Sequence, residues 1–140
     1  KSHIDGPCSR FHIRRLKSGR LLMINHYQFD QRIDLDDIMH QGNVKSWKGR
    51  SHLTALLSED DGKTWPYTLL LDERNEVSYP DAKEAADGYI YVSYDWERVT
   101  QREILMARFT EDDILNGKIS SSKGKLRILV NKATGQPDIH

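Results

Sequence analysis

Short apolar runs separated by glycine-containing turns dominate the chain and predict β-strands. The runs are FHIRRL, RLLMINHY, HLTALL and YTLLLD in the first half, then YPDAKEA, YIYVSYD and EILMARFT in the second. Aliphatic, aromatic and β-branched residues fill them, and the turn sequences KSG, EDDGKTW and ADG interrupt them. The later segment TEDDILNGK predicts one helical turn, because Thr110 can cap it and Asp113 lies three residues further on.

The chain also repeats itself. Leu16–Tyr27 aligns with Ala85–Trp96, and Arg50–Asp61 aligns with Arg102–Asp113. Internal repeats indicate an architecture built from one repeated unit. Two units result, at about residues 10–72 and 77–131, and the first is longer because it contains the segment 28–49.

Each unit has the length and strand pattern of a four-stranded propeller blade. The sequence therefore predicts an all-β fold, with two antiparallel four-stranded blades that are part of one domain over residues 1–140. A single antiparallel sandwich is the alternative. Because a propeller needs about four to eight blades, two blades cannot close a ring. We therefore expect the rest of the propeller to come from a longer parent chain.

Charge and composition restrict the possible partners. Lysine plus arginine and aspartate plus glutamate both number 21, so no basic excess indicates nucleic acid or an anionic membrane. No apolar run approaches the roughly 20 residues of a membrane-spanning helix. Cys8 is the only cysteine, which excludes an internal disulfide. The histidines lack metal-ligand spacing, and we expect neither a metal nor a cofactor.

The stretch SEDDGKTW concentrates acids, hydroxyls and a tryptophan in eight residues. A calcium loop fails on spacing, because counting back from the glycine puts Leu57 at a ligand position. A catalytic carboxylate pair fits poorly, since adjacent turn residues tend to point apart. Serine and aspartate side chains do stabilise tight turns by bonding nearby backbone N–H groups, and Gly62 permits positive φ. The stretch therefore predicts a structural turn.

The same stretch resembles the Asp-box, Ser-x-Asp-x-Gly-x-Thr-Trp, of sialidase-type (neuraminidase-like, BNR-repeat) β-propellers. The defining positions are all present: Ser58, Asp60, Gly62, Thr64 and Trp65. The resemblance implies that the chain forms the C-terminal blades of a propeller of about six blades. It further implies a secreted or periplasmic location.

A candidate binding site follows from the topology. Successive turns of a meander alternate between the two ends of a sheet, so the KSG and Asp-box turns share one end. The opposite end collects Arg10, His26, Tyr27, the segment 28–49, Arg50, Tyr79, Asp95, Trp96 and Arg102. Long loops on a rigid scaffold often line binding sites, so we expect the site at this opposite end.

The resemblance to sialidases assigns roles there. GRSHLTALLSEDDGKTW, VSYPDA and GYIYVSYD resemble the last blades of those enzymes. Arg50 occupies the position of an arginine that grips the substrate carboxylate, a task suited to its planar fork of donors. Tyr79 occupies the position of the nucleophile, a known exception to the paired carboxylates of glycosidases. Because sialidases place the remaining catalytic groups in earlier blades, we expect the segment alone to be inactive.

Two positions depart from the sialidase pattern. Pro80 follows Tyr79 where a small residue is usual, and Asp95 stands where many sialidases have glutamate. The other candidate substrate-binding residues are His26, Asp81, Asp95 and Trp96, with Trp47 as a second stacking tryptophan. Asp81 is included because residues two apart in a strand share a face with each other, which would place it beside Tyr79.

The resemblance favours a retaining exo-glycosidase that removes a terminal acidic sugar, such as sialic acid, from glycans. Two alternatives stay open from the residues alone. One is a glycoside-processing propeller for a different sugar, and the other is a non-catalytic carbohydrate-binding propeller that keeps the Asp-box for its fold.

Overall fold

The structure, a computed structural model, describes residues 4, 6, 7, 9–28 and 50–135. Of the predicted loop at 28–49, residues 29–49, with Trp47, lie outside the described residues. Strands β1 (His12–Arg15), β2 (Leu21–His26), β3 (Leu53–Ser58) and β4 (Tyr67–Asp72) form one sheet. Strands β5 (Val77–Glu84), β6 (Ile90–Trp96), β7 (Glu103–Phe109) and β8 (Lys125–Lys132) form the other.

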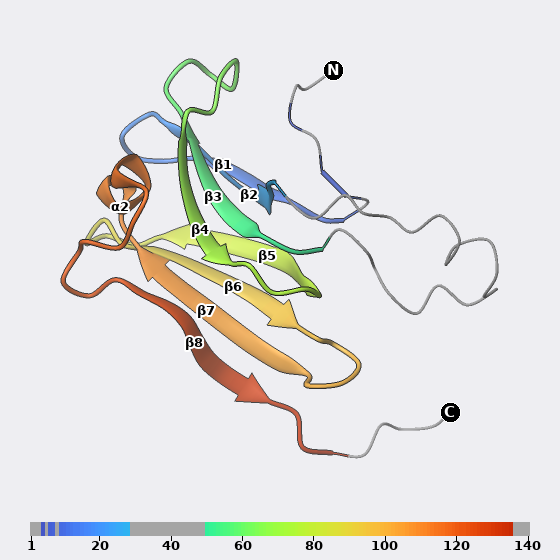
Figure 1. Cartoon of the computed structure of the whole chain (residues 1–140). Coiled ribbons are helices and arrows are strands. Elements are labelled where there is room, and N and C mark those ends of the chain that lie inside the picture. Colours follow the sequence, from blue (N-terminus) through green and yellow to red (C-terminus); the bar gives the residue numbers. More distant parts are fainter. Residues whose placement is uncertain (1–3, 5, 8, 29–49, 136–140) are drawn as a thin grey trace.

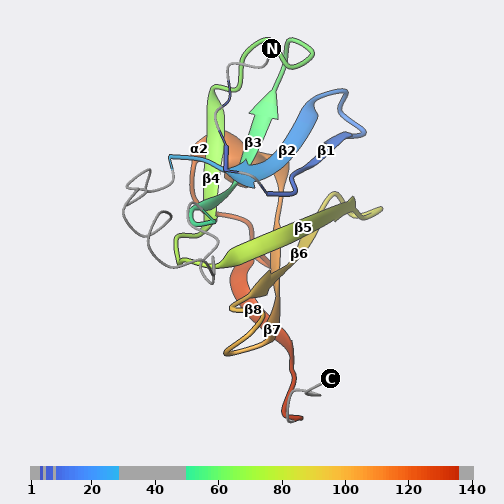
Figure 2. The ribbon, with the colours of Figure 1, turned by 90° about the vertical axis from the view of Figure 1, so that its right-hand side faces the viewer.

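Each sheet is an antiparallel meander, with its strands side by side in chain order (Figure 1). The predicted all-β class with two four-stranded antiparallel sheets is therefore confirmed. Figure 2 shows the β1–β4 sheet packed against the β5–β8 sheet.

The internal repeat is visible in the first turn of each sheet. In the first sheet, the Leu16 N–H donates to the Arg20 carbonyl at 2.8 Å and the Gly19 N–H donates to the Leu16 carbonyl at 2.9 Å. The second sheet has the equivalent pair: the Ala85 N–H donates to the Tyr89 carbonyl at 2.8 Å, and the Gly88 N–H donates to the Ala85 carbonyl at 3.1 Å. Gly19 and Gly88 both have positive φ, at 93° and 85°, a conformation that glycine adopts without a steric penalty. The KSG turn of the first sheet and the ADG turn of the second therefore have the same backbone structure.

The core lies between the two sheets. Strand residues alternate between two faces, and the inward faces supply one cluster of buried apolar side chains. Leu22, Ile24 and Leu57 come from the first sheet, and Val92 and Phe109 come from the second; all five are fully buried. The packing of this core fixes one sheet against the other.

A short helix, α2 (Glu111–Asn116), follows β7 and contacts β3 and β4 of the first sheet. The Thr110 side chain accepts from the Asp113 backbone N–H, and the Asp113 side chain accepts from the Thr110 backbone N–H, which confirms the predicted helical turn and its capping box. Gly117 ends the helix in the left-handed conformation. Ile114 is fully buried, so the helix belongs to the core between the sheets.

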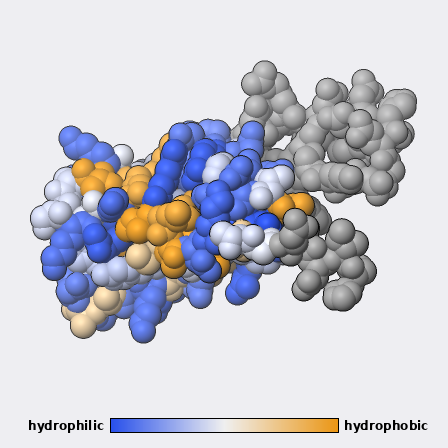
Figure 3. Space-filling model, turned by 90° about the horizontal axis from the view of Figure 1, so that it is seen from below, coloured by the Kyte–Doolittle hydropathy of each residue, from blue (hydrophilic) through white to orange (hydrophobic). Residues whose placement is uncertain are grey.

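Both sheets carry exposed apolar side chains. The first sheet and the residue before it expose Phe11, Ile13 and Leu70, and the second sheet exposes Ile104, Leu129 and Val130. Figure 3, which views the molecule from below, shows apolar residues gathered on the surface seen there. No helix among the described residues is long and apolar enough to span a membrane.

Candidate functional site

The Asp-box turn between β3 and β4 binds its own backbone. Ser58 Oγ accepts from the Gly62 N–H at 2.8 Å and donates to Asp60 Oδ1 at 2.8 Å. Asp60 accepts from the Thr64 N–H at 2.8 Å and from Thr64 Oγ1 at 2.6 Å. Trp65 Nε1 donates to the Gly62 carbonyl at 3.2 Å. Each side chain with a defining role in the motif thus stabilises the turn itself.

These bonds favour the ionised form of Asp60. The hydrogen bond from the Thr64 side chain, followed by that from the Thr64 backbone, lowers the pKa of Asp60 to about 2. Gly62 has a φ of 85°, which explains the glycine at this position. The motif's polar groups are occupied within the turn, and this geometry fits a structural role.

The Asp-box and KSG turns lie at the same end of the first sheet, as the meander predicts. Arg15 Nη1 is 2.9 Å from Asp61 Oδ1, and Arg20 Nε is 2.9 Å from Glu59 Oε1. Arginines from the β1–β2 turn region therefore pair with acids of the Asp-box. We call this end of the molecule the Asp-box end.

Tyr79 stands at the opposite end, near the start of β5, with an unusual backbone. Its φ is 54°, a left-handed value that is an outlier for a bulky aromatic residue. The pairing between β5 and β6 shifts register between Ser78 and Asp81, so Tyr79 lies within an irregular stretch. The side chain is 41% exposed. Strained conformations of this kind cost about 1–3 kcal/mol and concentrate at functional sites.

Arg98, from the loop between β6 and β7, covers the Tyr79 ring. Its Cζ is 4.0 Å from the ring centroid, close enough for a cation–π interaction. Asp95 Oδ2 accepts from Arg98 Nε at 2.9 Å, and Asp95 Oδ1 accepts from Ser78 Oγ at 2.5 Å. Its hydrogen bond with Asp95, with a smaller contribution from Tyr79, raises the pKa of Arg98.

Arg50 approaches the same tyrosine from the segment before β3. Its Cζ is 5.8 Å from the Tyr79 ring centroid. The Arg50 carbonyl accepts from the Val77 N–H at 3.1 Å, which ties the two segments together. The structure therefore brings together three of the residues selected from the sequence, Arg50, Tyr79 and Asp95, and adds Arg98 and Ser78 to them. We call these five residues the Tyr79 cluster.

Two other candidates have different polar partners. Asp81 is beyond the register shift, and its Oδ1 is 3.1 Å from His12 Nδ1 of the first sheet, with a side chain that is 73% exposed. His26 is fully buried, with Nδ1 2.9 Å from the Ser51 carbonyl. Burial, and to a lesser degree the charge of Arg50, lowers the pKa of His26. A neutral interior imidazole supports this end of the sheet, and its burial keeps it from direct contact with a ligand.

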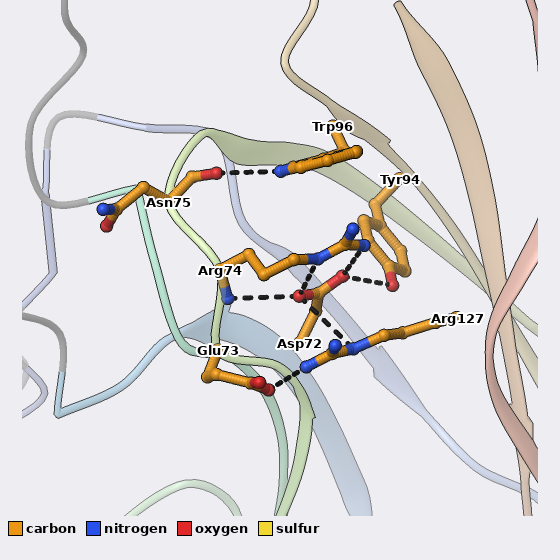
Figure 4. Close-up of polar contacts among 7 residues, drawn as sticks. All are labelled: Asp72, Glu73, Arg74, Asn75, Tyr94, Trp96 and Arg127. Carbon is orange, nitrogen blue, oxygen red and sulfur yellow. Dashed lines mark hydrogen bonds and ion pairs between the residues drawn. The ribbon is translucent and has the colours of Figure 1, made fainter. Parts of the chain in front are cut away.

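The Trp96 side chain is held by the loop that follows β4 (Figure 4). Its Nε1 donates to the Asn75 carbonyl at 3.1 Å, and the Arg74 Cζ lies 3.9 Å from its ring centroid. Arg74 is in turn bound by both carboxylate oxygens of the buried Asp72, at 2.9 and 2.7 Å. One face of the Trp96 ring is therefore already covered, which restricts stacking on a sugar to the other face.

Asp72 links the two sheets. Its carboxylate also accepts from Tyr94 Oη of β6 at 2.9 Å and lies 3.6 Å from Arg127 Nε of β8. Arg127 further pairs with Glu73. Burial by itself raises the pKa of Asp72, but the hydrogen bonds from Arg74 outweigh it and the pKa is lowered. Burial and the Asp72 charge raise the pKa of Tyr94, which stays a neutral donor.

The sequence reasoning missed Arg98, Arg74 and Arg127. Arg98 follows Asp95 by three residues and Arg74 follows Asp72 by two, so opposite charges close in sequence at the ends of strands were a usable signal. Arg127 has a φ of 54° within an irregular part of β8, and no local pattern indicates its partner 55 positions earlier.

No group of three or more His, Cys, Asp or Glu side chains in the described part of the chain could hold a metal ion. The Tyr79 cluster instead offers guanidinium groups and a phenol. Guanidinium groups bind carboxylates and stabilise developing negative charge, and an exposed phenol can act as a nucleophile.

The sequence matches a known protein family. The family model described as "BNR repeat-like domain" matches residues 2–92, a range that includes the Asp-box, Arg50 and Tyr79. No curated protein and no solved structure matches the chain.

Proposed function

The chain belongs to the BNR repeat-like family, and from this premise we propose that it is the part of a sialidase-like propeller that carries the nucleophile of a glycosidase. The proposed reaction removes a terminal acidic sugar, such as sialic acid, from a glycan with retention of configuration. Tyr79 is the nucleophile in this proposal, and Arg50 binds the carboxylate of the sugar.

The observation that carries the proposal is the position of Tyr79. An exposed phenol in a strained conformation lies beside two guanidinium groups, with Arg98 and Arg50 at 4.0 and 5.8 Å from the ring. Strained residues cluster at active sites, and Tyr79 is a bulky aromatic residue with a positive φ, whereas the other described non-glycine residues with positive φ, such as Asp61, are polar. An anionic sugar also suits a neutral tyrosine nucleophile better than a carboxylate, because the phenol does not repel the substrate.

The chemistry would take two steps. Tyr79 Oη attacks the anomeric carbon, gives up its proton to a base and forms a glycosyl–tyrosine bond, while an acid protonates the departing oxygen. Water then attacks the same carbon, the tyrosine oxygen leaves and recovers a proton, and the sugar is released with its original configuration. Arg50 would hold the carboxylate through both steps.

The acid, the base and further arginines would come from other blades. The exposed apolar side chains on the outer faces of the two sheets, among them Ile13 and Ile104, suit burial against neighbouring blades. On this proposal each sheet is one blade, over about residues 10–72 and 77–131. The location, secreted or periplasmic, is proposed from the family resemblance.

A non-catalytic carbohydrate-binding propeller is the second candidate. The stacking of Arg98 on the Tyr79 ring and its ion pair with Asp95 favour it, because both groups already have partners. A glycoside-processing propeller for a different sugar is favoured by Pro80, which is buried directly after Tyr79.

The test is hydrolysis of a fluorogenic aryl sialoside by the full-length parent protein, with Tyr79→Phe beside wild type. Tyr91→Phe is the matched control, because Tyr91 pairs with Arg108 toward the Asp-box end of the same sheet. We expect Tyr79→Phe to lower kcat by about 10³-fold or more and Tyr91→Phe to leave it within about twofold. Equal activity of the two variants would remove Tyr79 as nucleophile. A folded parent that is inactive on the sialoside would exclude sialic acid as substrate and turn attention to other glycosides and to binding.

A further inference from the structure

The connection between the two sheets, residues 73–76, is tied to the end of β6 by its backbone. The Asn75 carbonyl accepts from Trp96 Nε1 at 3.1 Å, and the Glu76 carbonyl accepts at 3.1 Å from the backbone N–H that follows Trp96. Glu76 has a φ of 65°, a left-handed value that is uncommon outside glycine. Because Tyr79 follows soon after Glu76 in the chain, the path of this connection decides where the tyrosine stands.

The Arg74 side chain lies between Trp96 and the carboxylate of Asp72 (Figure 4). Its Cζ is 3.9 Å from the centroid of the Trp96 ring, which is within the range of a cation–π interaction. Along its edge, Nε and Nη2 donate to the two oxygens of Asp72 at 2.9 and 2.7 Å, the paired geometry that arginine forms with a carboxylate. The guanidinium is therefore fixed both by a charge and by the indole ring next to it.

Asp72 is anchored independently of Arg74. Its side chain is fully buried, accepts from Tyr94 Oη of β6 at 2.9 Å and lies 3.6 Å from Arg127 Nε of β8. These two partners bind the end of β4 to the second sheet, whereas Arg74 extends the network to Trp96. The network therefore has two arms that can be cut separately, one toward β6 and β8 and one toward Trp96.

Trp96 and its neighbour Asp95 hold the start of β5. Trp96 pairs with Val77, and Asp95 pairs with Ser78, whose hydroxyl donates to the Asp95 carboxylate at 2.5 Å. The regular pairing is then interrupted, and Tyr79 lies within the interruption. A strained residue keeps its conformation only where the surrounding structure over-determines it. For the left-handed Tyr79, that structure includes the two strand pairs immediately before it.

We propose that Arg74 is a positioning residue for Tyr79. Anchored by the buried Asp72, it fixes Trp96 and the end of β6, against which the start of β5 is held, so that Tyr79 keeps its left-handed conformation. Arg74 acts through Trp96 and the backbone rather than on a ligand. The inference rests on the proposed function only in taking the Tyr79 cluster to be the site.

The test observes Tyr79 by fluorine NMR of the full-length protein labelled with fluorotyrosine, and it requires no turnover. The Tyr79 resonance is identified by its absence in Tyr79→Phe. We expect Arg74→Met, which retains an unbranched side chain without the guanidinium, to shift and broaden this resonance. Tyr94→Phe is the matched control, because it removes one hydrogen bond from the same Asp72 carboxylate and leaves the contact of Arg74 with Trp96 in place. It should lower the thermal midpoint and leave the Tyr79 resonance at its wild-type position.

A second variant covers the case in which Arg74→Met does not fold, because that substitution removes a positive partner of the buried Asp72. Trp96→Phe keeps an aromatic ring beside Arg74 but removes the donor to the Asn75 carbonyl. It should also displace the Tyr79 resonance, with the bonds of Asp72 unchanged. Arg74→Lys retains a positive charge for both Asp72 and the ring, and it should return the resonance toward its wild-type position.

Kinetics on the aryl sialoside give a second readout. A misplaced nucleophile slows the bond-forming step more than it weakens binding, so Arg74→Met should lower kcat by about tenfold or more and change KM by less than about threefold. Tyr94→Phe should leave both constants within about twofold of wild type.

A Tyr79 resonance that stays in place in folded Arg74→Met or Trp96→Phe would overturn the proposal. Equal displacement in Tyr94→Phe would overturn it as well, since any loosening of the network would then have the same effect. A resonance displaced as expected, in a protein without hydrolysis, retains Arg74 as a positioning residue and removes the glycosidase. Hydrolysis that requires Tyr79 and is unchanged in Arg74→Met retains the glycosidase and removes the role of Arg74.

Discussion

The two ends of the sheets use the same kinds of side chain in opposite ways. At the Asp-box end, carboxylates accept hydrogen bonds from their own turns: Asp60 binds Thr64, and Asp113 accepts from the backbone N–H groups of Thr110, Ser120 and Ser121. At the other end, Tyr79 is strained and exposed, and arginines lie over its ring.

The difference distinguishes a structural turn from the candidate site. Carboxylates that are saturated by backbone donors stabilise the fold and leave little capacity for a ligand. The exposed Arg98 guanidinium and the exposed Tyr79 beside it remain open to solvent, and the positive φ of Tyr79 carries a cost in stability. Substitutions at the Asp-box end should therefore change stability, and substitutions in the Tyr79 cluster should change function.

Asp113→Ala should have the largest effect on stability. Asp113 is fully buried, and the hydroxyls of Ser120 and Ser121 also donate to it, so the substitution leaves several donors without an acceptor. We expect a loss of about 3 kcal/mol or more in the free energy of unfolding, measured by chemical denaturation of the full-length protein. Asp112→Ala is the control, because the adjacent Asp112 is exposed on the same helix. Similar losses for the two would show that helix charge, rather than the buried hydrogen bonds, matters.

Low pH should destabilise the protein by protonating carboxylates at the Asp-box end. The pKa of Asp113 is lowered to about 2, because its hydrogen bonds from Ser121 and Ser120 outweigh the opposing effect of burial, and that of Asp60 is lowered to about 2 mainly by Thr64. A folded-state pKa below the ordinary value contributes stability above pH 4, which is lost as the pH falls toward 2. Denaturation curves between pH 5 and pH 2 should show this loss, and it should be shallower in Asp60→Asn/Asp113→Asn. A double variant with the wild-type slope would place the titrating groups elsewhere.

Tyr79→Asn should have the smallest effect on stability and the opposite sign. Asparagine tolerates positive φ better than tyrosine, so relief of strain should raise the free energy of unfolding by about 0.5–1 kcal/mol. Tyr91→Asn, within the regular part of β6, should lose stability because asparagine is a poor strand residue. Destabilisation by Tyr79→Asn as large as that by Tyr91→Asn would mean that Tyr79 is held for packing.

Most of the fold could be predicted because its signals are local. Gly19 and Gly88 mark tight turns, Thr110 and Asp113 mark a capped helix, and short apolar runs between the turns mark the strands. The site was predictable only where it follows from strand order, as for Arg50, Tyr79 and Asp95, which meet at one end of the sheets.

The other features of the candidate site depend on irregular backbone conformations, which the sequence does not reveal. Tyr79 and Asp81 are both exposed on either side of the buried Pro80, but the pairing of β5 with β6 shifts register between Ser78 and Asp81, and no sequence pattern indicates that shift. Arg98 lies in a loop whose path is set by the left-handed Glu97, a conformation that composition does not indicate. His26 appeared accessible because it ends a strand, yet the packed sheets bury it completely.

The central claim, that the Tyr79 cluster is the site and the Asp-box end is the scaffold, is tested most directly by measuring two properties on two variants. Hydrolysis of the aryl sialoside and the free energy of unfolding would be measured for Tyr79→Phe and Ser58→Ala in the full-length protein. We predict that Tyr79→Phe loses hydrolysis with wild-type stability, and that Ser58→Ala loses about 1–2 kcal/mol with wild-type kcat. A Tyr79→Phe variant that remains active but unfolds more easily, or a stable Ser58→Ala variant that is inactive, would contradict the account.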